Sequence, residues 1–193
     1  MKKDQRWVVT RIDGKIASVS ADFRGLSRVS EYVAKLPVDI IAEITVTKVS
    51  TDDLAGLSAT TKWEDMRLAG TPFQLNVWRK LYLLTHHEDG TPIMPGEGIK
   101  LLSYSQLADL CENPRGVRAV AHAVACNPVA YIIPCHLIVP KEAIDKILAI
   151  RTVAEGTIFK GTDLYLLDSI DVGEYEYGSE LKRRLIEKQL YSR

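Results

Sequence analysis

The residues with the clearest chemical potential are Cys135 and His136, which are adjacent and follow Pro134 at the end of an apolar run. A cysteine attacks only as its thiolate, and a nearby histidine is one of the groups that lower the pKa of a thiol. This spacing predicts a nucleophilic cysteine. The run also follows a segment typical of a DNA-binding helix, and a reactive thiol carried by such an element suggests chemistry on nucleic acid.

The other two cysteines, Cys111 and Cys126, have no basic neighbour and are expected to be inert packing or surface thiols. An odd count of three cysteines argues against a disulfide scaffold and favours a reducing, cytoplasmic compartment. No cysteine or histidine spacing is typical of zinc, so neither a metal nor a cofactor is expected. No export signal or membrane-spanning apolar stretch is evident in the sequence.

The composition is that of an ordinary soluble globular protein, with 46% hydrophobic and 26% charged residues in a chain of 193. This length allows one large domain or two small ones. Proteins that bind nucleic acid generically carry an excess of basic residues, whereas the formal net charge here is zero. If DNA is the partner, the positive potential must be local.

The first part of the chain has the pattern of a small α/β domain without a catalytic motif. Its expected elements are strands at residues 7–12 and 15–20, a helix at 26–36 that ends before Pro37, a strand at 39–49, and a linker with a short helix at 51–70. Asp13-Gly14 between the first two strands is a strong type I′ hairpin signal. We place the domain boundary between residues 1–68 and residues 69–193.

The second part of the chain is predicted to be mostly helical. Thr71-Pro72-Phe73-Gln74 begins a helix, because threonine is a good N-cap and glutamine three residues later completes a capping box. The further expected elements are a helix-turn-helix with helices at 105–110 and 115–125, a strand at 137–139, a helix around 144–151, and a last helix at 179–190. Residues 85–98 are expected to form a loop in which His86 and His87 are solvated.

The second helix of the helix-turn-helix carries an unusual number of small residues, namely Ala119, Ala121, Ala123 and Ala125. One interpretation is tight packing in a core. The other is a helix that comes very close to nucleic acid. The minor groove is only about 6 Å wide, so a helix pressed against it needs small side chains.

Residues 71–139 and 173–190 resemble the O6-alkylguanine-DNA alkyltransferases, also called methylated-DNA–protein-cysteine methyltransferases. The matching motifs, in the family's order, are Thr71-Pro-Phe-Gln-x-x-Val-Trp78, Tyr104-Ser-Gln-Leu-Ala108, Arg118-Ala-Val120, Asn127-Pro128, Ile133-Pro-Cys-His136 and Gly173-x-Tyr-x-Tyr-Gly178. The Pro-Cys-His block with Asn-Pro upstream is highly specific. The N-terminal part shows no motif match, only a compatible architecture.

The resemblance implies an α+β fold, with a small RNase H-like α/β domain followed by a mostly helical, winged-helix-like domain that contains the helix-turn-helix. It implies a monomeric DNA repair protein that irreversibly takes an alkyl group from O6-alkylguanine, or from O4-alkylthymine, in double-stranded DNA. O6 is buried in the base stack, so the base must be flipped out before it can react. The second helix of the helix-turn-helix would enter through the minor groove.

The resemblance also implies roles for particular residues. Cys135 would attack the alkyl carbon, and His136 would take the thiol proton through a water. Tyr104 would rotate the flanking phosphate and protonate guanine, while Asn127 would brace the turn before the cysteine. The residues expected on DNA are Arg118, which fills the space of the flipped base, with Arg115, Ala119 and His122. The substrate pocket would be formed by Val129, Pro134 and Tyr175.

This chain departs from the family's pattern at two places near the cysteine. Leu137 stands where the family has arginine, which removes polar contacts there. A glutamate of the last helix completes a Cys-His-Glu relay in the family. Alignment puts Gln189 at that position, with Glu187 two residues earlier, so either Glu187 substitutes or the relay is weaker.

Two other classes of protein remain open. The first is an alkyltransferase-like protein that binds damaged DNA without reacting; such relatives lack the cysteine, so Cys135 argues against it. The second is a helix-turn-helix regulator that does not flip bases. A regulator needs polar side chains that read the major groove, and the alanines of residues 119–125 argue against that.

Overall fold

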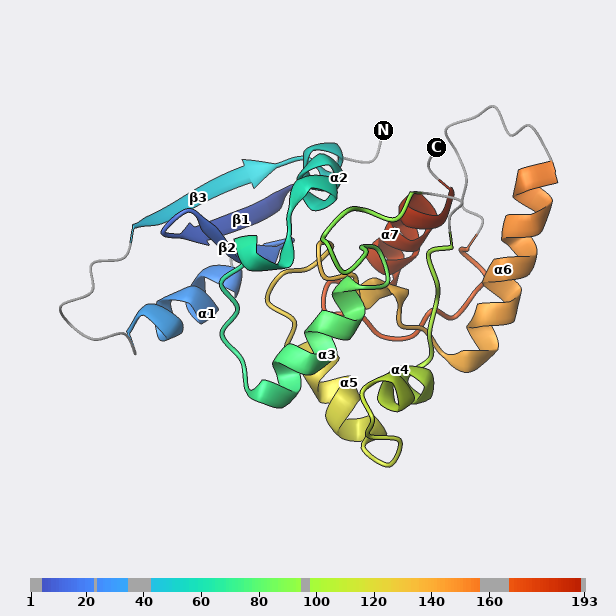
Figure 1. Cartoon of the computed structure of the whole chain (residues 1–193). Helices are drawn as coiled ribbons and strands as arrows, with labels where there is room; N and C mark the ends of the chain where they lie inside the picture. Colours follow the sequence, from blue (N-terminus) through green and yellow to red (C-terminus); the bar gives the residue numbers. More distant parts are fainter. Residues whose placement is uncertain (1–4, 23, 35–42, 95–97, 157–166, 192–193) are drawn as a thin grey trace. The chain divides into compact units, whose positions relative to one another are not determined.

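A computed structural model describes residues 5–22, 24–34, 43–94, 98–156 and 167–191 (Figure 1). The chain divides into two compact units. The N-terminal unit holds Met1–Pro92 and Cys126–Cys135, and the C-terminal unit holds Ile93–Ala125 and His136–Arg193. This division differs from the boundary expected after residue 68, because residues 69–92 and the segment that ends at Cys135 belong to the N-terminal unit. The domain boundary itself stays a prediction.

The N-terminal unit contains an antiparallel sheet with the strand order β2-β1-β3 (Figure 1). The strands are β1 Trp7–Ile12, β2 Lys15–Ser20 and β3 Ile44–Val49. Asp13 and Gly14 have φ angles of 51° and 77°, as a type I′ turn requires, so the predicted hairpin is confirmed. Helix α1, Arg24–Val33, packs beside β1 and β2. The predicted helix end at Pro37 and the predicted start of β3 at Asp39 lie outside the described residues.

Three helical segments complete the regular structure described in this unit: α2 Thr51–Thr60, the 3-10 helix η1 Trp63–Asp65, and α3 Pro72–Tyr82. The predicted capping box of α3 is confirmed. Gln74 N–H donates to Thr71 Oγ1 at 3.2 Å, and Thr71 N–H donates to Gln74 Oε1 at 2.9 Å. Helix α2 has the same arrangement at Ser50 and Asp53, so both helix starts are determined by local sequence.

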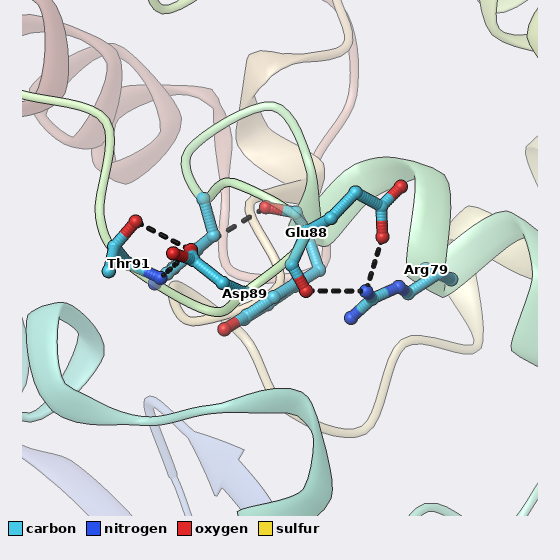
Figure 2. Close-up of polar contacts among 6 residues, drawn as sticks. Arg79, Glu88, Asp89 and Thr91 are labelled. Carbon is cyan, nitrogen blue, oxygen red and sulfur yellow. Dashed lines mark hydrogen bonds and ion pairs between the residues drawn. The ribbon is translucent and has the colours of Figure 1, made fainter.

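The loop after α3 is closed by polar contacts (Figure 2). Arg79 donates to the Glu88 carboxylate at 2.6 Å and to its main-chain oxygen at 3.3 Å. Asp89 Oδ1 accepts bonds from the Thr91 amide at 2.9 Å and the Thr91 hydroxyl at 2.6 Å. The first part of the loop expected after Thr85 is therefore a turn held by side-chain hydrogen bonds.

His86 is buried, which corrects the expectation that it is solvated. Its ring stacks on that of Tyr82 with centroids 4.0 Å apart, and its Nε2 lies 3.0 Å from Ser58 O. Nδ1 lies 3.0 Å from the Thr85 hydroxyl, which can donate to it, so the contacts suit a neutral ring with its proton on Nε2. Burial lowers the pKa of His86, which favours the neutral ring. Its neighbour His87 is exposed, as expected.

The C-terminal unit contains the predicted helix-turn-helix, α4 Tyr104–Leu110 and α5 Val117–Ala125, which pack together (Figure 1). The later helices are α6 Lys141–Gly156 and α7 Ser179–Tyr191, both predicted. The expected strand at 137–139 is wrong. Cys135–Leu137 is instead a 3-10 helix, η2, followed by an isolated bridge between Leu102 and Ile138. The α+β class is confirmed, and none of the helices described could span a membrane.

Candidate active site and DNA-binding helix

The segment that leads to the cysteine continues the N-terminal sheet at the edge of β2. Val19 N–H donates to Pro128 O at 2.9 Å, and Ala130 N–H donates to Val19 O at 3.0 Å. The two bonds form a parallel bridge between Val19 and Val129. The sheet therefore fixes the start of the turn that ends at Cys135.

Asn127 is buried within this turn and bonds across it. Its Nδ2 donates to Ile133 O at 2.8 Å, and its Oδ1 accepts from Val129 N–H at 3.0 Å. The Cys135 amide also donates to Ile133 O, at 2.8 Å. The side chain of Asn127 and the backbone of Cys135 thus share one carbonyl, so Asn127 restrains the position of the cysteine.

The middle of the turn has a left-handed residue, Tyr131, with φ of 74°. Residues other than glycine rarely adopt this conformation, which costs on the order of 1–3 kcal/mol. The Tyr131 ring is buried and packs 6.4 Å from the Trp7 ring between centroids. Burial, with a smaller effect of Asp52, raises the pKa of Tyr131 to about 12. Aromatic packing therefore holds the turn in a form that its backbone disfavours.

The remaining predicted residues of this turn differ in exposure. Val129 and Pro134 are buried, whereas Cys135 is half-buried. Cys135 opens η2 as a reduced thiol. The structure thus places Asn127, Val129, Pro134 and Cys135 within one turn, and the roles expected of them in the site stay predictions.

His136 is fully buried in the C-terminal unit, where its Nε2 contacts Gln189 Oε1 on α7. Burial lowers the pKa of His136 to about 4; the bond to Gln189 opposes this effect, and the positive charge of Lys182 adds to it. The imidazole is therefore neutral at neutral pH. Leu137, which replaces an arginine of the family pattern, is buried as well and packs as an apolar residue.

Glu187 bonds to the backbone of the chain before α7. Its Oε1 accepts a hydrogen bond from Leu167 N–H at 3.0 Å, and burial raises its pKa. Of the two residues that the sequence left as partners of His136, the structure places Gln189 against the ring. Gln189 is therefore the partner that the geometry supports, and the relay role of Glu187 stays a prediction.

The loop before α7 carries Tyr175, whose ring makes an edge contact with Tyr177 at 5.5 Å between centroids. Gly178 N–H donates to Tyr175 O at 2.9 Å. Lys182, which the sequence analysis had not put forward as a site residue, is fully buried, and its Nζ donates to Glu174 O at 3.3 Å. A buried lysine is uncommon, and here its hydrogen bond connects the loop that contains Tyr175 to α7, the helix that carries Gln189.

Tyr104 is the first residue of α4, and it is half-buried. The chain just before it is paired with the chain just after His136. Leu102 N–H donates to Leu137 O at 3.2 Å, and Val139 N–H donates to Leu102 O at 2.9 Å. This short bridge fixes the start of α4 relative to His136 within the C-terminal unit.

Helix α5 has one exposed face and one buried face. Arg118, Ala119 and His122 are exposed on the helix, and Arg115 is exposed just before it. Ala123 is in the core, together with Val120 and Val124. The alanines are therefore divided: Ala123 packs in the core, whereas Ala119 is exposed, and a close approach of α5 to nucleic acid stays a prediction. The exposed face combines small side chains with two arginines and a histidine.

The sequence is similar to those of known methyltransferases. The family model of the 6-O-methylguanine DNA methyltransferase DNA-binding domain matches residues 95–146. A methylated-DNA–protein-cysteine methyltransferase of Methanosarcina mazei is 30% identical over 128 residues, which cover 63% of this chain and 73% of that protein. The chain belongs to this methyltransferase family. The match with the M. mazei protein, over 128 residues, extends well beyond the helix-turn-helix.

Other relatives are matched over less of their length. A protein of Acanthamoeba polyphaga mimivirus, named probable methylated-DNA–protein-cysteine methyltransferase, is 40% identical over 78 residues, 40% of this chain and 44% of that protein. The chain thus spans less than half of the length of this relative. The crystal structure of an O6-methylguanine-DNA methyltransferase from Pyrococcus kodakaraensis has the same fold, with a TM-score of 0.53 and 18% identity over 98% of this chain and 94% of that chain.

Proposed function

We propose that this protein repairs DNA by irreversibly moving an alkyl group from O6-alkylguanine to Cys135. The observation that carries the proposal is the turn of residues 127–135, in which Asn127 restrains a half-buried cysteine directly before a buried, neutral histidine. The names of the relatives support the same chemistry. We further propose that it acts as a cytoplasmic monomer without a cofactor.

The reaction is a displacement at the alkyl carbon. The Cys135 thiol gives its proton to His136, and the sulfur electron pair forms an S–C bond while the C–O6 bond breaks. The electrons of that bond go to guanine, which takes up a proton from the Tyr104 hydroxyl. The product is a thioether on Cys135 and an unmodified base. A thioether is not hydrolysed under these conditions, so each molecule reacts once.

The exposed face of α5 is proposed to bind the minor groove. Small residues such as Ala119 allow a close approach, and Arg118 would occupy the space that the flipped base leaves. Arg115 and His122 would contact the backbone on either side. The net charge of zero means that this local pair of arginines, and not the whole surface, supplies the attraction to phosphate.

A second function is favoured by one observation, the neutral partner of His136. Gln189 cannot stabilise an imidazolium as a carboxylate would, so transfer of the thiol proton is less favoured. A protein in which this step fails would bind alkylated DNA without repairing it. Binding of damaged DNA and alkyl transfer are therefore the two functions to separate.

The test is intact-mass spectrometry after incubation with a duplex that contains O6-methylguanine. A repair protein gains one methyl group, and the Cys135→Ser variant gains none. A matched unmodified duplex is the control for nonspecific adducts. Tight binding of the modified duplex without any gain in mass would rule out the transferase and leave the damage-binding protein.

A further inference from the structure

Helix α7 presents one face to the interior of the C-terminal unit. Lys182, Leu185, Ile186 and Leu190 are buried, and Gln189 lies on the same side of the helix. The amide of Gln189 meets the ring of a histidine that is fully buried. The contact is partly buried, and Gln189 supplies the ring with a fixed protein partner that influences how the histidine holds its proton.

The atoms in contact point to one tautomer of His136. Gln189 presents its Oε1, which only accepts, so the histidine Nε2 must donate. A neutral imidazole has one N–H, and placing it on Nε2 leaves the lone pair on Nδ1. The opposite orientation of the amide would put the proton on Nδ1 and leave no base there.

We propose that Gln189 is a positioning residue that holds the proton of the neutral His136 ring on Nε2, so that Nδ1 is the acceptor for the Cys135 proton. The catalytic part of this inference rests on the alkyl transfer proposed above. The charge and the tautomer of His136 do not rest on it, and they can be measured without any substrate.

The charges around the ring explain why an amide differs from a carboxylate here. Lys182 of α7 is a charged group that acts on His136, and it disfavours a second positive charge. Glu187, also on α7, bonds to Leu167 N–H instead. With a neutral partner, a standing thiolate–imidazolium pair is disfavoured. Cys135 therefore keeps its proton until the alkyl carbon is in place, and His136 takes the proton as the S–C bond forms.

The experiment uses the full chain with ¹⁵N-labelled histidine and follows the ring nitrogens by NMR as a function of pH. Among the four histidines, His136 is assigned with a His136→Gln variant. We expect a neutral ring from pH 7 to pH 5 with the proton on Nε2. In Gln189→Glu, a carboxylate beside the ring should raise the pKa by about 1–3 units. Glu187→Gln, two residues away, is the matched control and should leave the His136 signals unchanged.

Several outcomes would overturn the proposal. These are a proton on Nδ1 in the unchanged protein, an imidazolium at pH 7, or a titration that responds to Glu187→Gln and not to Gln189→Glu. If Gln189→Glu does not fold, Gln189→Met serves instead, since loss of the acceptor should populate both tautomers. A single Nε2–H tautomer in that variant would equally contradict the proposal.

Alkyl transfer is measured on the same samples from pH 5 to pH 8. We expect a different pH profile in Gln189→Glu, with a rising limb that follows the new pKa of His136, and an unaltered profile in Glu187→Gln. Expected NMR results without transfer in any variant would refute the proposed function but keep the tautomer assignment. Transfer with the same profile in every variant would refute the positioning role alone.

Discussion

Replacement of Asn127 by alanine tests the turn that carries the cysteine. The change removes two buried bonds, one of 2.8 Å to Ile133 O and one of 3.0 Å from Val129 N–H. Each buried group left without a partner costs about 1–3 kcal/mol. Ile133 O keeps its hydrogen bond from the Cys135 amide, so the loss of the bond from Asn127 costs an amount at the low end of that range. The free energy of unfolding should therefore fall by roughly 2–4 kcal/mol.

Urea unfolding measures this loss, and hydrogen exchange locates it. The Val129 amide, whose recorded acceptor is Asn127 Oδ1, should exchange much faster in Asn127→Ala. Asn76→Ala on the exposed side of α3 is the matched control and should change stability by less than about 0.5 kcal/mol. Equal stability of the two variants, with unchanged exchange at Val129, would refute the proposed restraint of the turn.

Three further predictions concern charge, DNA and backbone. As the pH is lowered from 6.5 to about 4, His136 takes up a proton in the unfolded chain but stays neutral in the folded protein. The free energy of unfolding should therefore fall by up to about 3 kcal/mol over this range, and His86 should add to the loss. Urea unfolding at several pH values measures this, and His136→Gln should flatten the curve. Arg118→Ala should slow transfer from duplex DNA roughly tenfold more than transfer from free O6-benzylguanine, because it impairs flipping; equal losses would contradict that role. Gly173→Ala, at φ of 77°, should cost about 1–2 kcal/mol, whereas Gly56→Ala in open space on α2 should not destabilise.

Local signals in the sequence predicted most of the elements. The Asp13-Gly14 turn and the Thr71–Gln74 capping box depend on neighbouring residues alone, and both appear in the structure as expected. Burial by distant residues was harder to predict. His86 is adjacent to an exposed histidine in a polar loop, and it is buried because the Tyr82 ring and Ser58 O lie against it.

The helical spacing of α7 could have predicted which residue contacts His136. Successive residues of a helix are turned by about 100°, so Glu187 and Gln189 point about 200° apart. Gln189 follows Lys182 by seven residues and Ile186 by three, which puts it on their face. Lys182 and Ile186 are buried, and Gln189 is directed inward with them. Charge alone favours Glu187 as the partner of His136. The spacing of the buried residues along α7 favours Gln189 instead.

The most direct test of the account is the site and number of alkyl groups after reaction with O6-methylguanine in duplex DNA. Digestion and peptide mass spectrometry should place one methyl group per molecule on Cys135, with Cys111 and Cys126 unmodified as internal controls. A second addition of modified duplex should add nothing further. Methylation of another cysteine, or a Cys135 that stays unmodified while the duplex is bound, would contradict the account.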